Sequence, residues 1–258
     1  MSVLLDIWNE GRLETGMSNA EIRGRLEQDN AELVRSNREL EEFAYVASHD
    51  LKSPLLVVTG FLELLERTKG EQLDDDARMY VEAALRGAAR MGQLIDDLLM
   101  YSRVGRNDHN RQRVDLDIVA RQLLSDWSGA IDDANAIVRV GALPSVMGDP
   151  TLLRQLFENL VSNSLKFRRP GVDLIIDIDS ERSGGEWSIR VADNGIGVPL
   201  EHRERIFTMF TRLASTNDRP GSGIGLAICH RVVQAHGGRL WVDDGPSGGA
   251  CLRFTLPA

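Results

Sequence analysis

The sequence predicts two parts of different fold class: an antiparallel helical hairpin that dimerises into a four-helix bundle, and after it an α/β sandwich. Three observations support this prediction. Apolar residues recur with helical spacing from about Asn19 to Thr68. A second apolar helical pattern follows a short polar break. Beyond residue 112, strand and helix patterns mix without strict βαβ alternation, which favours helices on one face of a sheet.

The first predicted helix carries a heptad repeat in which asparagine occupies two of the a positions. Buried asparagines at such positions favour a two-stranded, in-register coiled coil, so the repeat predicts a parallel homodimer. An amphipathic helix packed within one chain is the alternative. The d positions are Leu26, Leu33, Leu40 and Ala47, and the a positions are Asn30, Asn37 and Ala44.

The helical pattern becomes richer in apolar residues after His49. Residues 69–76 interrupt it and supply carboxylates that suit the N-cap of the next helix, which is apolar to Leu99. Two antiparallel helices cannot close a core alone, whereas two such hairpins make a four-helix bundle. Dimerisation is therefore expected to be a requirement of folding.

Residues 105–112 are polar and aperiodic, which predicts a linker between a domain at 20–104 and a domain at 113–258. Residues 1–19 are an N-terminal segment of unknown role.

Asp149 suits a helix N-cap and Pro150 the first helical position. In the second domain we expect helices at about 116–132, from 150 onward, at 201–207 and at 223–236, and strands at 137–140, 172–181, 187–193, 239–243 and 250–256, with a hairpin turn at 182–186.

Composition excludes several classes of protein. The formal charge of −9 argues against a nucleic-acid binder, because phosphate backbones attract basic surfaces. No apolar run reaches the roughly 18 residues that suggest a membrane span, and the first residues are too acidic for a secretory signal. Cys229 and Cys251 have neither zinc nor disulfide spacing and lie in apolar stretches, so we expect both in the core. The prediction is a cytoplasmic protein.

His49 lies on the first helix between Ser48 and Asp50. A neutral imidazole is a competent nucleophile near neutral pH, and a neighbouring carboxylate can fix its tautomer and accept a proton. Pro54 removes the hydrogen bond to the Asp50 carbonyl and predicts a kinked or loosened helix one turn later. Taken alone, a helical histidine is more often structural, so this interpretation depends on the motifs that follow.

Asn159 and Asn163 stand four residues apart, hence on one helix face, and Lys166 follows one turn later. Amide oxygens suit Mg²⁺, and an ammonium group suits a phosphate. Solvated asparagines on a surface helix are the alternative.

Asp193 ends an apolar strand, and Gly195 and Gly197 follow it. The glycines let the backbone bend and approach a flat ligand, and a buried carboxylate at that point can accept from the amine of adenine. An ordinary turn is the alternative.

A glycine-rich stretch before the predicted helix at 223–236 suits a polyphosphate, because free backbone N–H groups and the positive dipole end lie there. It matches neither the dinucleotide fingerprint nor the P-loop. Residues 211–220 are polar and predict a mobile lid with Arg212 and Arg219 as its cations. The stretch contains Gly221, Ser222, Gly223, Gly225 and Leu226.

In these motifs and their order, the chain resembles sensor histidine kinases of two-component signalling, of the phytochrome- and PAS-linked subtype. The H box is 48–54, the N box 159–166, the G1 box 193–197, the F box 206–210 and the G2 box 221–226. The resemblance implies a HisKA dimerisation and phosphotransfer bundle joined to a Bergerat-type ATP-binding domain. It implies an ATP-dependent protein-histidine autokinase that passes its phosphoryl group to an aspartate of a response regulator receiver domain.

The resemblance also implies roles for single residues. His49 is phosphorylated, Asp50 assists proton transfer, Asn163 coordinates Mg²⁺ and Asp193 binds adenine. Phosphate contacts fall to Asn159, Lys166 and, from the lid, Arg212. Relatives that hydrolyse ATP carry a glutamate base where Asn159 stands, and Glu158 is expected to point about 100° away on the helix.

Departures from the family pattern leave some properties open. Ser53 stands where many relatives carry threonine or asparagine, so phosphatase activity toward the regulator is an open question. Ser164 replaces a common alanine, with no expected consequence. About twenty residues precede the coiled coil, so we expect that a sensor domain was removed or that a separate sensory protein delivers the signal. Two rival functions are an ATP-binding scaffold or pseudokinase that gathers signalling partners, and a serine kinase on the same nucleotide fold.

Overall fold

The computed structural model describes residues 19–104, 110–213 and 221–258, and for parts of the first helix it describes the backbone alone. The contacts within the chain divide it into two units, residues 1–47 and 48–258, which we treat separately. The first unit contributes the N-terminal part of helix α2 (Asn19–Lys69). Asn30 is exposed there, and the leucines of the heptad repeat lie outside the described side chains. The parallel coiled coil therefore stays a prediction.

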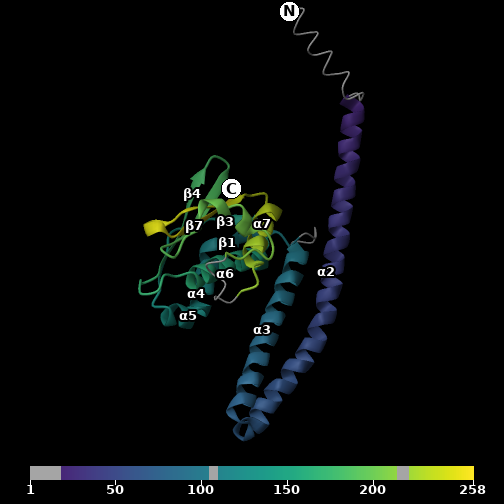
Figure 1. Cartoon of the computed structure of the whole chain (residues 1–258). Coiled ribbons are helices and arrows are strands. Elements are labelled where there is room, and N and C mark those ends of the chain that lie inside the picture. The colour runs from purple at the N-terminus through teal and green to yellow at the C-terminus, as the bar shows by residue number, and fades with distance from the viewer. Residues whose placement is uncertain (1–18, 105–109, 214–220) are drawn as a thin grey trace, which may run out of the picture. The chain divides into compact units, whose positions relative to one another are not determined.

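The second unit begins with the helical hairpin that the sequence predicts. Helix α2 continues through Pro54 to Lys69, so this proline does not end the helix. A short 3-10 turn, η1 (Gly70–Gln72), leads to the antiparallel helix α3 (Asp75–Val104) (Figure 1). The Asp74 carboxylate accepts a hydrogen bond from the Ala77 N–H at 2.7 Å, which confirms the predicted carboxylate cap. Lys52 Nζ and Asp96 Oδ1, 2.5 Å apart, join the two helices.

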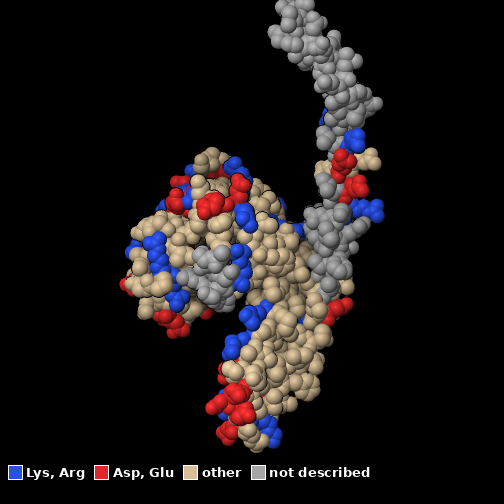
Figure 2. Space-filling model, in the orientation of Figure 1, with Lys and Arg blue, Asp and Glu red and all other residues tan. Residues whose placement is uncertain are grey.

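The hairpin exposes an unusual amount of apolar surface for a structured element. Phe61 is 68% exposed and Tyr80 is 65% exposed. Figure 2 shows a broad area of the hairpin almost without charged side chains in that view. Large exposed apolar patches on folded chains mark surfaces that bind other molecules. The exposed apolar residues of the hairpin are Leu51, Leu56, Val57, Val58, Phe61, Leu64, Leu65, Met79, Tyr80 and Met91.

Residues 110–258 form the mixed α/β part. Its main sheet has five strands in the order β2-β4-β5-β7-β6, with β2 parallel to β4 and the other pairs antiparallel. A separate antiparallel pair joins β1 and β3. The strands are β1 (Gln112–Asp115), β2 (Ile137–Val140), β3 (Ser145–Gly148), β4 (Ile175–Ser183), β5 (Glu186–Asp193), β6 (Leu240–Asp244) and β7 (Ala250–Pro257). The helices are α4 (Leu116–Asp126), α5 (Ser128–Asp133), α6 (Pro150–Lys166) and α7 (Gly225–Ala235).

One face of the sheet carries the core. Alternate residues on β4 and β5 are buried against the helices, as a half-buried strand requires, whereas β7 is buried at nearly every position. Phe157 of α6 meets Phe254 of β7 edge-to-face, with ring centroids 6.0 Å apart. Helices on one face of a mixed sheet are the arrangement that the sequence predicts, and the fold class is confirmed.

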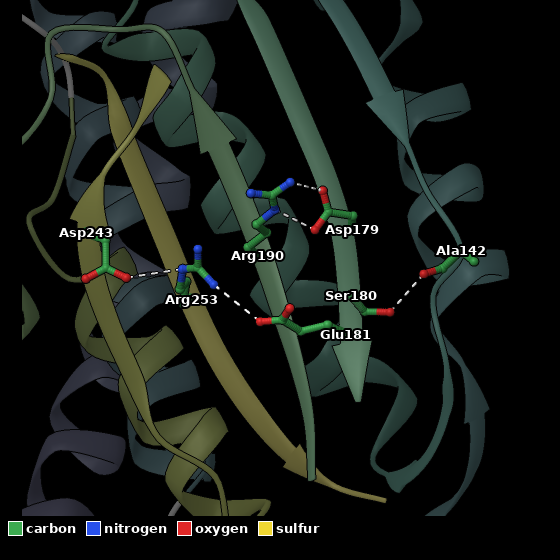
Figure 3. A network of polar contacts seen from close by, with 7 residues as sticks. All are labelled: Ala142, Asp179, Ser180, Glu181, Arg190, Asp243 and Arg253. Carbon is green, nitrogen blue, oxygen red and sulfur yellow. Dashed lines mark hydrogen bonds and ion pairs between the residues drawn. The ribbon is translucent and has the colours of Figure 1, made fainter. Parts of the chain in front are cut away.

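The other face of the sheet is polar, and ion pairs cross its strands (Figure 3). Arg190 of β5 makes two contacts with Asp179 of β4, at 2.5 and 2.6 Å, and this hydrogen bonding raises the pKa of Arg190. Arg253 of β7 lies 3.7 Å from Glu181 and 3.1 Å from Asp243. Each such pair contributes about 0–1 kcal/mol, so the network helps to set strand register more than it stabilises the fold.

Helix α6 begins as predicted. The Asp149 carboxylate caps it by accepting from the N–H groups of Thr151 and Leu152, and Pro150 is its first residue. The Asp149 N–H in turn donates to Nε2 of the buried His236, at 3.0 Å, while Nδ1 of His236 lies 2.7 Å from the Val232 carbonyl oxygen. This pattern requires the neutral tautomer with its proton on Nδ1.

Several predicted elements differ from the structure. The pair β1–β3 was not expected, and the helix predicted at 116–132 is two helices that break at Trp127. The helix predicted at 201–207 is two 3-10 turns, η2 (Leu200–His202) and η3 (Arg205–Phe207). Most of the predicted lid, with Arg219, lies outside the described residues.

Two smaller expectations also have an outcome. Cys229 and Cys251 are both buried, as predicted. Of the helices in the described ranges, none combines the length and the apolar character that crossing a membrane requires.

Candidate functional site

A cavity of about 550 Å³ brings together residues that lie far apart in the sequence. Helix α6, the loop after β5, the start of α7 and the first residue of β7 all contribute to its wall. Eleven of the twelve residues predicted to bind the nucleotide line it, and the twelfth, Gly195, lies directly behind the wall. The eleven are Asn159, Asn163, Lys166, Asp193, Gly197, Arg212, Gly221, Ser222, Gly223, Gly225 and Leu226.

Helix α6 presents the two asparagines and the lysine on the face that looks into the cavity. Nδ2 of Asn159 is buried and has no hydrogen-bond partner within the described part of the chain. A buried donor of this kind is rare in a folded protein and suggests a partner that arrives with a ligand. Burial raises the pKa of the Cys229 thiol, and the neighbouring Asn159 amide partly opposes that shift.

Asp193, the last residue of β5, is 6% exposed and is held by three donors. Oδ1 accepts from the N–H of Gly195 at 2.9 Å and from the N–H of Ala250 at 3.2 Å. Oδ2 accepts from the Ser164 hydroxyl at 2.9 Å. A carboxylate offers about four acceptor positions, so three donors fix its orientation and leave one position, on Oδ2.

Two glycines allow the backbone to close around Asp193. Gly197 has a φ of 73°, and a Cβ there would lie 2.5 Å from the carbonyl oxygen of Gly248. A Cβ on Gly249 would lie 1.9 Å from the carbonyl oxygen of Asp193 itself. Side chains at either position are excluded by backbone atoms, which cannot move aside as a flexible side chain can.

The start of α7 forms another part of the cavity wall. The Ile224 N–H donates to the Ser222 hydroxyl oxygen at 3.1 Å, and α7 begins at the next residue, Gly225. The N–H groups of a first helical turn have no partner within the helix, and the helix dipole makes this end positive. Lys166 Nζ reaches this end too, because it lies beside Gly221. A cavity lined by apolar side chains, a buried carboxylate, and cationic and N–H groups suits a nucleotide.

The chain matches two protein-family models. Residues 39–107 match HisKA, the His Kinase A (phospho-acceptor) domain, and residues 148–258 match HATPase_c, the histidine kinase-, DNA gyrase B- and HSP90-like ATPase. The chain belongs to the sensor histidine kinases. The second domain thus belongs to a family of ATPases, and the hairpin belongs to the family of phospho-acceptor domains.

Similar proteins agree with this assignment. The kinase is 37% identical over 225 residues to the phytochrome-like protein Cph1 of Synechocystis sp.. The matched region covers 87% of this chain and 30% of the relative. It is 40% identical over 226 residues to cyanobacterial phytochrome A of Nostoc sp., covering 88% of this chain and 29% of the relative. The chain therefore spans less than a third of the length of these relatives.

A solved structure of full-length ShkA in complex with AMPPNP is 30% identical to this kinase. The TM-score between the two is 0.68, and the match covers 84% of this chain and 45% of that one.

The remaining predicted site residues of the kinase lie on α2, which contributes none of the described residues that line the cavity. The backbone of His49 is helical, and its side chain lies outside the described part of the structure. Asp50 is exposed and Ser53 is exposed. The structure thus groups the predicted nucleotide-binding residues and leaves the predicted phosphate acceptor on a separate element.

Sequence reasoning missed several residues of this site. The Ser164 hydroxyl and the Ala250 N–H both donate hydrogen bonds to Asp193, and no sequence motif predicts either contact. Asp97 of α3 lines the cavity and accepts a hydrogen bond from the Ser222 hydroxyl. Glu158 lines the cavity as well, despite its expected direction, and forms an ion pair with Arg154.

Proposed function

We propose that this chain is an ATP-dependent protein-histidine autokinase that phosphorylates His49. The observation that carries the proposal is the cavity in which α6, the loop after β5 and the start of α7 meet. Its polar groups are complementary to a nucleotide, and the same chain matches a phospho-acceptor domain over residues 39–107, a range that contains His49.

The adenine of ATP would lie in the apolar part of the cavity, with its amine donating to Asp193. The apolar lining residues there are Ile196, Val198, Ile206, Leu213, Leu226 and Leu252. The phosphates would then lie toward Lys166, Arg212 and the first turn of α7, where cationic side chains and unpaired N–H groups stabilise negative charge.

The donor set also fits Mg²⁺ that accompanies the nucleotide. Asn163 lines the cavity and carries an amide oxygen, a suitable ligand for a hard cation. Mg²⁺ usually keeps several waters and takes its other ligands from phosphate oxygens, so one protein ligand suffices. When bound, the ion would neutralise charge on the phosphates.

In the proposed reaction, a ring nitrogen of His49 attacks the γ-phosphorus. A bond forms between that nitrogen and phosphorus, and the bond from phosphorus to the bridging oxygen of ADP breaks, so ADP leaves with the electron pair. The proton on the other ring nitrogen would pass to a base, a role that we assign to Asp50, the next residue of the helix. Phosphoryl transfer of this type depends on positioning and charge neutralisation.

Transfer to water is disfavoured by the same residues. A water nucleophile needs a base, and the amide of Asn159 cannot act as one. The neighbouring carboxylate of Glu158 is 3.0 Å from Arg154 Nε, and this ion pair holds it in place. The γ-phosphoryl group is thereby kept for His49.

The active form is proposed to be a homodimer. The apolar surface of the hairpin has no cover within the described part of the chain, and pairing two hairpins would bury it in a four-helix bundle. For this function we divide the chain into an N-terminal segment at 1–19, the dimerisation and phosphotransfer domain at 20–104, a linker at 105–112 and the ATP-binding domain at 113–258.

The phosphorylated imidazole is proposed to donate to an aspartate of a response regulator receiver domain. A sensor domain or a separate sensory protein would provide the input, and the proposed use of ATP favours a cytoplasmic location. Ser53, which is exposed close to His49 on the same helix, offers a hydroxyl for orienting a water during dephosphorylation of the regulator.

The test is labelling of the full chain with γ-labelled ATP and Mg²⁺. The wild-type chain should acquire acid-labile, base-stable label, and His49→Gln should acquire none while its ATP affinity in calorimetry stays the same. Nucleotide binding by the wild type without any label would support the binding-only scaffold instead.

A further inference from the structure

We propose that Ser164 is a positioning residue that determines the preference of this kinase for a 6-aminopurine, by orienting the free acceptor position of Asp193. The inference rests on the proposed function, because it concerns the way in which Asp193 meets the base. Its basis is the hydrogen bond between two buried groups, Ser164 at 2% exposed and Asp193 at 6% exposed.

The Ser164 hydroxyl has two acceptors within reach but a single proton. Its oxygen lies 2.9 Å from Asp193 Oδ2 and 3.3 Å from the carbonyl oxygen of Leu160, one helical turn earlier. A charged acceptor at the shorter distance wins this competition, because charge-assisted hydrogen bonds are about twice as strong as neutral ones. The hydroxyl therefore donates to Asp193, with the carbonyl of Leu160 as the second choice.

The donors around Asp193 determine where a ligand amine can bind. Oδ1 is occupied by the N–H groups of Gly195 and Ala250, whereas Oδ2 has only the Ser164 hydroxyl. The remaining acceptor position is on Oδ2, the atom that Ser164 holds. With Oδ1 anchored by two donors, the Ser164 contact is the third point that fixes the plane of the carboxylate.

Loss of this contact would let the carboxylate plane turn about its Cβ–Cγ bond over the range that the two hydrogen bonds to Oδ1 tolerate. The acceptor position on Oδ2 would then no longer point reliably at the base. Asp193 also has no ion-pair partner among the described residues, so these three hydrogen bonds set the orientation of its carboxylate. Loss of the Ser164 contact should therefore weaken binding of the adenine amine. It should affect binding of the triphosphate much less, because the phosphates would lie toward the start of α7.

The experiment is a thermodynamic cycle between Ser164 and the amine of the ligand. Calorimetry measures Mg²⁺-loaded ATP and purine riboside triphosphate, which lacks the 6-amino group, on the full wild-type chain and on Ser164→Ala. We expect Ser164→Ala to weaken ATP binding about tenfold and purine riboside triphosphate binding less than about threefold, in line with a hydrogen bond to a charged group. The matched control is Ser180→Ala in the second half of β4, outside the residues that line the cavity, where the hydroxyl donates to the Ala142 carbonyl oxygen at 2.8 Å; it should change neither affinity.

Equal loss of both nucleotides, or loss of neither, would overturn the inference and leave the proposed function standing. Failure of the wild-type chain to bind ATP would instead remove the proposed function and the inference together. Thermal unfolding without nucleotide checks that Ser164→Ala is folded. If it is not, Ser164→Cys, similar in volume and a weak donor, provides the same comparison.

Discussion

Gly249 lies so close to Asp193 that a Cβ on the glycine would be 1.9 Å from the aspartate carbonyl oxygen. The glycine begins the approach to β7, and the aspartate ends β5, the neighbouring strand. This contact brings the N–H of Ala250 to within 3.2 Å of the Asp193 carboxylate. The close approach of two backbones thus places one of the three donors that hold the Asp193 carboxylate.

Gly249→Ala is expected to destabilise the domain and its nucleotide site together. The new methyl group meets backbone atoms, so the strand end must move, at a cost of about 2–3 kcal/mol of unfolding free energy. ATP affinity should fall as the Ala250 N–H leaves Asp193. Urea unfolding and calorimetry measure the two effects.

The matched control for that substitution is Gly185→Ala. Gly185 lies in the β4–β5 turn, where an added Cβ would have no neighbour within 4 Å. A change of less than about 1 kcal/mol is expected there. Equal stability of the two variants would contradict the steric account.

Asp193→Asn should keep the fold but lose ATP. The amide oxygen can still accept from the N–H groups of Gly195 and Ala250. The Ser164 hydroxyl can donate its proton to the Leu160 carbonyl oxygen, 3.3 Å away, and its oxygen can then accept from the new amide group. The edge that faces the base becomes a donor and opposes the adenine amine. We expect a loss of about 2–3 kcal/mol in ATP binding, roughly 30- to 150-fold.

Inosine triphosphate provides the discriminating readout for this variant. Its 6-oxo group is an acceptor, so Asp193→Asn should bind it better relative to ATP than the wild type does. Asp179→Asn, which removes charge from an ion pair on the outer face of the sheet, is the control and should leave both affinities unchanged. An unaltered ratio of the two nucleotides in Asp193→Asn would show that Asp193 does not read the base.

His236→Ala is expected to weaken the start of α6. The substitution removes the acceptor of the Asp149 N–H and leaves a cavity in a site that is 3% exposed. Leaving a buried donor unpaired costs about 1–3 kcal/mol, and the lost packing adds to this figure. Urea unfolding should show a loss of at least about 2 kcal/mol, against less than about 0.5 kcal/mol for His202→Ala in turn η2. Similar values for both variants would mean that the imidazole contributes nothing through Asp149.

Much of this fold is predictable from the sequence because its signals are local. The capping residues Asp74 and Asp149 and the alternation along β4 and β5 place these elements correctly. The pair β1–β3 has only four residues in each strand, too few for a pattern to emerge. The helix break at Trp127 preserves the apolar spacing, so periodicity cannot detect it.

The same distinction holds for the site. Asparagines four apart and glycine-rich boxes predict the residues that line the cavity, because their spacing is visible along the chain. The Ser164–Asp193 bond joins residues 29 positions apart, and the Ala250–Asp193 bond joins residues 57 apart. Such bonds depend on the way the sheet and α6 pack, which no local pattern encodes. The position of Asp97 beside Ser222 was missed for the same reason.

The apolar surface of the hairpin predicts the effect of Phe61→Glu. A charge at a position that is 68% exposed in one chain should be harmless to a monomer but costly inside a four-helix bundle. Sedimentation equilibrium should show dissociation of a dimer at concentrations where the wild type remains paired. Met147→Glu on β3, 61% exposed in the other domain, is the control and should leave the mass unchanged. A dimer that withstands Phe61→Glu would place the interface elsewhere.

The most direct measurement is to locate the phosphate on the full chain after incubation with Mg²⁺ and ATP, by mass spectrometry under neutral conditions. The account predicts one phosphate on the imidazole of His49, lost in acid and retained in base. Phosphate on Ser48 or Ser53, stable in acid, would contradict it, as would a chain that binds ATP and remains unmodified.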